Sequence, residues 1–312
     1  MADKELGGSP SMLPLFARAS LAAIPGASRL PWVGGGGGEV PDTALTRTDV
    51  AVDSDRLAAY DRVCGFDLSD TLPATYPHML AFPMHLALMT DGRFPLAAMG
   101  LVHIANAITV HRPVRISERL ALRVWATPIE PHPRGRQFTV RTEARVGGEL
   151  VWEESSINLA RGKPAGDGPD APSAAAEPEI PSTAELPVTA TWRCPGDLGR
   201  RYGSVSGDLN PIHIHPLSAR MFGFPSAIAH GMWTKARCLA ALGPELPGAY
   251  SVAVAFRKPI RLPATVQFTE AAGGGAGGAG VAGVAGATTA FGVRDAKRGT
   301  PHLDGLVTPA RG

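Results

Sequence analysis

The chain has 312 residues, 44% of them hydrophobic and 19% charged, and a formal net charge of +2. This length suits two domains with sizeable cores, and the near-neutral balance gives no electrostatic reason to expect nucleic acid or an anionic membrane as a partner. Three widely spaced cysteines, Cys64, Cys194 and Cys238, argue against a disulfide framework or a zinc ribbon and indicate reduced thiols in a cytoplasmic protein.

Residues 1–55 are predicted to form an N-terminal extension of helix and loop. Met12 to Ile24 is apolar but is interrupted by Arg18, which favours a surface helix over an export signal. The run Gly34–Gly38 is a loose segment rather than a phosphate-binding loop, because no Lys-Ser or Lys-Thr follows it.

A first module is predicted at residues 56–160. It contains an apolar, helix-like stretch at Tyr76–Met89, which is interrupted by Pro83. The segments after this stretch have the apolar and polar pattern of strands, and the strand candidates are 107–114, 118–128, 137–145 and 150–159.

Residues 161–187 are rich in Pro, Ala, Gly and Ser, a composition typical of a linker. They precede a second module at residues 188–312, in which Ile228–Leu242 is predicted to be a buried helix. The uncharged stretch Ala271–Val293 is mostly Gly and Ala, which indicates a loop between strands rather than a membrane span. The strand candidates of this module are 250–256, 264–269, 288–295 and 302–307.

Each module thus contains a buried helix followed by a predicted antiparallel meander. A repeat of this order predicts two related α+β modules, each with a helix wrapped by a sheet. A helix wrapped by a sheet in this way is called a hot-dog fold.

The stretch Tyr202–Trp233 carries the residues suited to chemistry. Gly207 and Pro211 punctuate a loop in which Asp208, Asn210 and His213 lie close in sequence. Near pH 7 the Asp is ionised and the His is largely neutral, so both can accept a proton or hold a water molecule.

His230 and Gly231 are predicted to open the buried helix of the second module. Backbone N–H groups at a helix start have no partner within the helix and can stabilise a developing negative oxygen. A water activator combined with such an oxyanion site suits the addition of water to an α,β-unsaturated thioester, or the reverse dehydration.

The string SGDLNPIHIH, followed by His230-Gly231-Met232, resembles the signature of the MaoC-like (R)-specific enoyl-CoA hydratase family. The resemblance covers most of the chain and implies an α+β double hot-dog fold. It also implies reversible hydration of trans-2-enoyl thioesters to (3R)-hydroxyacyl thioesters in fatty-acid metabolism. By this resemblance Asp208 and His213 activate the water, Asn210 orients the site, and Gly231 donates to the thioester oxygen. His230 would contact the substrate.

The first module has no counterpart of this loop, so the resemblance implies one active site per chain. Its segment Gly100–His103 looks like the family's non-catalytic half, which makes room for the acyl chain. His103 either lines this pocket or is a half-buried structural histidine. Arg257 and Lys258 either meet the phosphates of coenzyme A or form a solvated basic pair.

Two other functions stay open. A hot-dog thioesterase usually carries a carboxylate on its central helix, and Ile228–Leu242 contains no Asp or Glu. A non-catalytic acyl-binding subunit would not need the Asp208 and His213 pair. We expect no metal, because His213 and His215 lack a third ligand at convincing spacing. We also expect no cofactor beyond coenzyme A or acyl-carrier protein as part of the substrate, and a homodimer stays open.

Overall fold

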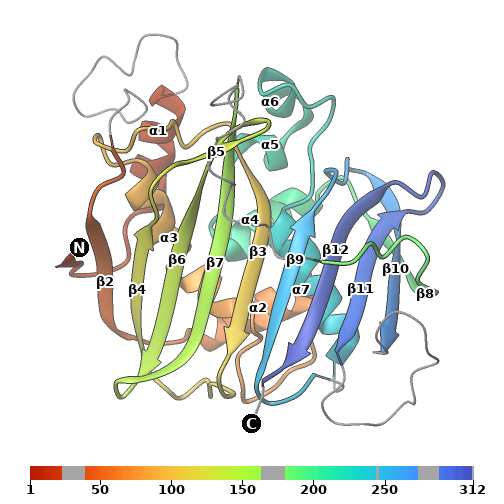
Figure 1. The fold of residues 1–312 in the computed structure, drawn as a ribbon, viewed down its shortest axis with the longest axis horizontal. Coiled ribbons are helices and arrows are strands. Elements are labelled where there is room, and N and C mark those ends of the chain that lie inside the picture. The colour runs from red at the N-terminus through yellow and green to blue at the C-terminus, as the bar shows by residue number, and fades with distance from the viewer. Residues whose placement is uncertain (23–38, 163–179, 244–245, 273–287, 311–312) are drawn as a thin grey trace. The chain divides into compact units, whose positions relative to one another are not determined.

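The computed structural model describes residues 1–22, 39–162, 180–243, 246–272 and 288–310 (Figure 1). The run Gly34–Gly38, most of the linker 161–187 and most of the Gly/Ala stretch lie outside the described residues. The chain divides into two compact units. The first comprises Met1–Val52, Pro77–Ile104 and Ser117–Glu177, and the second Asp53–Tyr76, Ala105–Ile116 and Pro178–Gly312. This grouping assigns residues 53–76 and 105–116 to the second unit, whereas the sequence-based division assigns them largely to the first module.

The first unit contains helices α1 (Met12–Ala22) and α3 (Tyr76–Met89). Only the first residue of α3, Tyr76, is assigned to the second unit. The sheet of the first unit has the order β1-β2-β4-β6-β7, with β5 beside β6. Only β1 and β2 pair in parallel among these strands. The bounds are β1 Ala2–Glu5, β2 Thr43–Val50, β4 Leu120–Ala126, β5 Glu130–His132, β6 Gly135–Val146 and β7 Glu149–Arg161.

Helix α3 is apolar on all sides, and almost all of its residues are buried, as expected of a helix without a polar face. Two buried histidines connect it to the sheet of the first unit. The Nδ1 atom of His78 lies 2.8 Å from a carboxylate oxygen of Glu154 on β7. The Nε2 atom of His85 lies 2.7 Å from the hydroxyl of Thr142 on β6.

The second unit contains α2 (Ser54–Cys64), α4 (Leu198–Ser206), α5 (Pro211–Ile214), α6 (Pro216–Met221) and α7 (Gly231–Leu242). Its antiparallel sheet has the order β3-β9-β12-β11-β10-β8, with β3 entering this unit at Ala105. The bounds are β3 Leu101–Val110, β8 Val188–Cys194, β9 Tyr250–Phe256, β10 Ala264–Ala272, β11 Thr289–Asp295 and β12 Pro301–Pro309.

The second sheet departs from the predicted simple meander at one point. Strands β10, β11 and β12 are consecutive neighbours, but β9 pairs with β12 instead of β10. The connection 257–263 therefore crosses between strands instead of forming a hairpin. It contains Pro259 and Pro263, which cannot donate ladder hydrogen bonds, and its Arg261 forms an isolated bridge with Ile228.

Helix α7 is the central helix of the second unit, and most of its residues are buried. It packs against α2, where the indole of Trp233 donates to the Val63 carbonyl at 3.0 Å. On its other side, the ammonium of Lys235 donates to Asn106 Oδ1 on β3 at 2.6 Å and to the Val252 carbonyl on β9 at 3.1 Å. These bonds connect the helix to two adjacent strands.

Most of the long elements agree with the sequence, but β3 (Leu101–Val110) begins six residues before the predicted strand 107–114 and ends four residues before its end. The structure confirms the helix at Tyr76–Met89, despite Pro83, and the strand at Tyr250–Phe256, and it begins the second buried helix at Gly231. The N-terminal helix is also present, but the extension includes strands β1 and β2, which were not expected. Six further elements were not predicted from the sequence, namely β5, β8, α2, α4, α5 and α6. Among the helices that the structure describes, none has both the length and the apolar character needed to span a bilayer.

Replacement of Lys235 by Met should lower the free energy of unfolding by about 2 kcal/mol, because buried acceptors on β3 and β9 would lose their donor. Chemical denaturation of the whole chain measures this change. Lys4→Met, at an exposed position, is the control and should change stability by less than about 0.5 kcal/mol. Equal stability of the two variants would contradict the structural role assigned to Lys235.

Candidate active site

The predicted loop forms a turn between α4 and α5. Helix α4 ends at Gly207, which adopts a left-handed conformation with φ of 83°. The carboxylate of Asp208 then accepts a hydrogen bond from the N–H of Asn210 at 3.1 Å. The amide oxygen of Asn210 accepts in turn from the N–H of Ile212 at 3.3 Å and caps α5. Asn210 thus shapes the loop through its backbone contacts.

His213 lies on the short helix α5 and is buried. Its Nδ1–H donates to the carbonyl of Ile228 at 2.8 Å, because a carbonyl oxygen can only accept. In the neutral ring, the proton on Nδ1 leaves a lone pair on Nε2. Burial lowers the pKa of His213, while the nearby Asp208 carboxylate and the bond to Ile228 act in the opposite direction. The ring is therefore a neutral base near pH 7.

His230 immediately precedes helix α7 and stacks on His213, with ring centroids 3.7 Å apart and an angle of 26° between the planes. Its Nε2–H donates to the backbone carbonyl of Asp208 at 3.0 Å. Burial, and then the neighbouring His213, hold the pKa of His230 well below its ordinary value. His230 thus connects the start of α7 to the Asp208 loop as a neutral ring.

The side chains of Asp208, His213 and His230 converge. One carboxylate oxygen and one nitrogen from each ring all lie within 4.8 Å of one another. The Asp208 side chain is 24% exposed whereas that of His230 is 3% exposed, so the cluster is accessible from the Asp208 side. Such a cluster can hold a water molecule between an anionic acceptor and a neutral base.

The same three side chains could also hold a divalent cation, since they supply one oxygen and two imidazole nitrogens. The third ligand is His230 and not His215. The ring of His215 is exposed, and its Nδ1 accepts from the N–H of Leu217 at 3.1 Å as the cap of α6. The expectation of no metal stays a prediction.

A second group of potential ligands lies in the first unit. His78, His85 and Glu154 are buried, and each offers one atom within 4.8 Å of the others. These atoms already make the hydrogen bonds that connect α3 to the sheet. Burial lowers the pKa of His85 to about 3, which keeps this ring neutral. The group is a satisfied polar contact within the core of the unit.

Gly231 is the first residue of α7, where backbone N–H groups have no partner inside the helix. A Cβ atom at this position would lie 3.0–3.3 Å from the ring of Phe256. Only glycine therefore fits without displacing the ring. The predicted helix start is present, and its position directly after His230 places an N–H donor next to the cluster.

Gly199 was not selected from the sequence, although it determines how closely α4 approaches α5. A Cβ atom on Gly199 would lie 1.9 Å from the backbone oxygen of His213. The missed signal is a glycine inside an amphipathic helix, where it weakens the helix and therefore needs a packing reason. Ser206 opens the predicted motif, but no role was predicted for it; its hydroxyl accepts from the N–H of Asp208 at 3.1 Å.

The two remaining candidates lie outside the cluster. The guanidinium of Arg257 donates to the carboxylate of Asp304 at 2.7 Å. That carboxylate is buried, so Arg257 already forms an ion pair within the fold. His103 lies on β3 in the first unit and is not among the side chains that the second unit brings together.

Comparisons with known proteins agree with this architecture. A family model described as "MaoC like domain" matches residues 173–290. The chain is 33% identical over 298 residues to 3-hydroxyacyl-thioester dehydratase X of Mycobacterium tuberculosis, covering 96% of this chain and 98% of the relative.

Two solved structures are similar to the fold. The crystal structure of HtdX from Mycobacterium tuberculosis has a TM-score of 0.71 and 32% identity, covering 86% of this chain and 100% of that chain. A MaoC-like dehydratase from Phytophthora capsici has a TM-score of 0.62 and 18% identity, covering 87% of this chain and 96% of that chain. This likeness, together with a buried helix and a largely antiparallel sheet in each unit, confirms the α+β double hot-dog fold.

Replacement of Gly199 by Ala should displace the backbone of His213, because the new methyl group would overlap its carbonyl. We expect a loss of about 1–3 kcal/mol of stability, as for other overpacked sites, and shifted NMR signals from the His213 ring. Gly196→Ala is the matched control, since a Cβ there meets no atom within 4 Å. Unchanged His213 signals in Gly199→Ala would contradict this packing.

Proposed function

Because the chain belongs to the MaoC-like dehydratase family, we propose that it catalyses the reversible hydration of trans-2-enoyl thioesters to (3R)-hydroxyacyl thioesters. The observation that carries this proposal is the convergence of Asp208, His213 and His230 within 4.8 Å, directly before the first turn of α7. The family assignment is shown by a relative that is 33% identical over 96% of this chain. We place the activity in fatty-acid metabolism.

The water molecule is held by the Asp208 carboxylate and the lone pair on His213 Nε2. Its oxygen forms a bond to the β-carbon of the enoyl group, and the electron pair of the double bond moves toward the thioester oxygen. The N–H of Gly231 donates to this oxygen and stabilises the charge that develops on it. The Asp208 and His213 pair takes one proton from the water and returns a proton to the α-carbon, so the catalyst is unchanged at the end.

The protonation state of His213 supports its role as a base. A base must be unprotonated to accept the proton of water, and burial lowers the pKa of His213 in the direction that keeps it so. Asn210 and His230 are positioning residues. Asn210 shapes the loop, and His230 donates to the backbone carbonyl of Asp208. His103 lies in the other unit, where we assign it to the acyl pocket as a prediction.

The carrier is coenzyme A or acyl-carrier protein, and the chemistry needs no other cofactor. We place the enzyme in the cytoplasm, because all three of its cysteines are buried and free. A thioesterase remains the alternative activity, but helix α7 carries no Asp or Glu. Release of free thiol from an enoyl thioester would identify that activity.

Asp208→Asn and His213→Gln should each lower hydratase turnover by about 10²–10⁴-fold, because either change removes a proton acceptor from the water. Thermal stability of Asp208→Asn should stay nearly unchanged, since Asn keeps an oxygen for the bond from the Asn210 N–H. His213→Gln also loses the imidazole that donates to the Ile228 carbonyl and stacks on His230, so its turnover is compared at a temperature where circular dichroism shows the variant to be folded. Loss of the conjugated thioester absorbance of crotonyl-CoA and of longer enoyl-CoAs measures turnover. His215→Gln is the control in the same motif. Near-normal turnover in either catalytic variant would show that the roles are wrong.

The product should be the (3R)-hydroxyacyl thioester. One rigid loop presents Asp208 and His213 to one face of the enoyl group while Gly231 holds the carbonyl, so water and proton are added from the same side. This geometry requires one dominant enantiomer, and the R assignment follows from the family. Coupling to dehydrogenases specific for the R or the S alcohol measures it. A signal mainly from the S-specific enzyme would mean that the substrate lies in the opposite orientation.

A further inference from the structure

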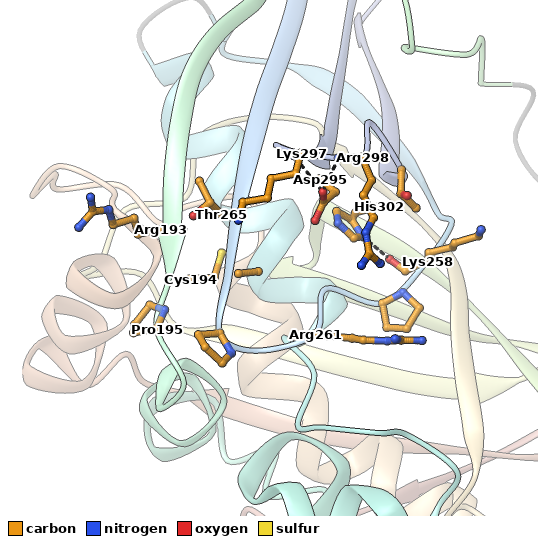
Figure 2. A pocket seen from close by; sticks show the side chains of 14 residues that line it. Arg193, Cys194, Pro195, Lys258, Arg261, Thr265, Asp295, Lys297, Arg298 and His302 are labelled. Carbon is orange, nitrogen blue, oxygen red and sulfur yellow. Dashed lines mark hydrogen bonds between the residues drawn. The ribbon is translucent and has the colours of Figure 1, made fainter.

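A basic hollow of about 890 Å³ lies in the second unit, apart from the Asp208 cluster (Figure 2). Its walls come from the end of β8, the start of β10, the crossing segment 257–263 and the turn after β11. Five basic side chains line it, and Figure 2 shows Arg193 at one edge with Lys258 and Arg261 at the other. These side chains are Arg193, Lys258, Arg261, Lys297 and Arg298.

The positive charge of this hollow is largely uncompensated. Asp295 is the one carboxylate among the lining residues. Its Oδ1 atom accepts hydrogen bonds from the backbone N–H groups of Lys297 and Arg298, at 2.9 and 2.7 Å. Five cations against one anion leave a charge of +4 in the lining, although the formal charge of the whole chain is only +2. Such a concentration of charge favours an anionic ligand.

His302 adds a polar atom to the same hollow. Its Nδ1–H donates to the carbonyl of Lys258 at 2.8 Å, which determines the orientation of the ring. Residue His302 is 9% exposed, and its Nε2 has no hydrogen-bond partner among the described residues. The hollow therefore contains a buried, oriented imidazole as well as exposed cations.

The hollow and the catalytic loop share a segment of backbone. The N–H of Ala229 donates to Ile260 at 2.9 Å, and the N–H of Leu262 donates to Ala227 at 2.8 Å. Between them, Arg261 bridges Ile228, the residue whose carbonyl holds His213. Residues 260–262 of the crossing segment thus pair with residues 227–229, which lead into α7. The same crossing segment carries Lys258 and Arg261.

We propose that this hollow binds the phosphates of the nucleotide half of coenzyme A while the acyl thioester occupies the Asp208 loop. The proposal rests on the proposed function and names the carrier that this site selects. Its volume lies within the range of small-ligand sites, and a concave site suits a compact polyanion better than the surface of a carrier protein. Arginine and lysine are the usual partners of phosphate oxygens.

The structure also separates the two adjacent basic residues selected from the sequence. Arg257 forms an ion pair with buried Asp304 and belongs to the fold. Lys258 is exposed and lines the hollow together with Arg261. Of Arg257 and Lys258, we therefore assign the phosphate contact to Lys258.

The test compares crotonyl-CoA with crotonyl-pantetheine, which has the same reacting group and no phosphate. The variant is the triple change Lys258→Gln, Arg261→Gln and Arg298→Gln in the full chain. Arg136→Gln, which removes an exposed charge on β6 outside the hollow, is the matched control. We expect the triple variant to raise KM for crotonyl-CoA about tenfold, because several exposed charge pairs are lost together, with kcat within about twofold.

The KM for crotonyl-pantetheine should be unchanged in the triple variant, and Arg136→Gln should match the original chain with both substrates. An equal rise in KM for both substrates, or no rise for crotonyl-CoA, would overturn the proposal. A rise in KM for crotonyl-acyl-carrier protein alone would also overturn it and would assign the hollow to a protein carrier.

A binding measurement separates this proposal from the proposed function. Free coenzyme A should bind the original chain and Arg136→Gln equally in calorimetry, and the triple variant about tenfold more weakly. If this pattern holds while no thioester is hydrated, the nucleotide site stands and the dehydratase assignment fails. If hydration proceeds but the triple variant binds coenzyme A normally, the nucleotide site fails and the dehydratase assignment stands.

Discussion

The candidate site depends on the hydrogen bond from His213 Nδ1 to the carbonyl of Ile228. This bond determines which nitrogen of the ring carries the proton, and it connects α5 to the segment that leads into α7. The same segment pairs with the crossing connection through Arg261. One side-chain contact therefore links the base, the helix start that supplies Gly231, and the backbone that carries Lys258. The site is built from local segments held together by non-local backbone pairing.

The chemistry relies on a low-dielectric location that is only partly closed. His213 and His230 are buried and neutral, whereas Asp208 is partly exposed and can meet water and substrate. The buried imidazoles can accept a proton while the accessible carboxylate contacts water and substrate, so the two residue types can perform different tasks within 4.8 Å of one another.

Much of the site could be predicted from the sequence because its chemistry is concentrated in one short motif. Asp208, Asn210 and His213 lie within six positions, and His230-Gly231 marks the helix start. Gly199 was missed because its role depends on which backbone lies opposite it, and a contact with His213 cannot be read from a glycine in a helix. The strand order was also only partly predictable. Apolar alternation locates β9 and β10, but it does not encode that β9 pairs with β12.

The stacked pair His213 and His230 makes the stability of the folded chain depend on pH. Both rings have a lowered pKa in the folded chain, chiefly through burial. Below the ordinary histidine pKa the unfolded chain therefore binds more protons than the folded chain, and the stability contributed by the neutral pair decreases as the pH falls. In a 3.7 Å stack, charging one ring also disfavours charging the other. The arrangement that supplies a neutral base thus makes this part of the protein less stable at acid pH than at neutral pH.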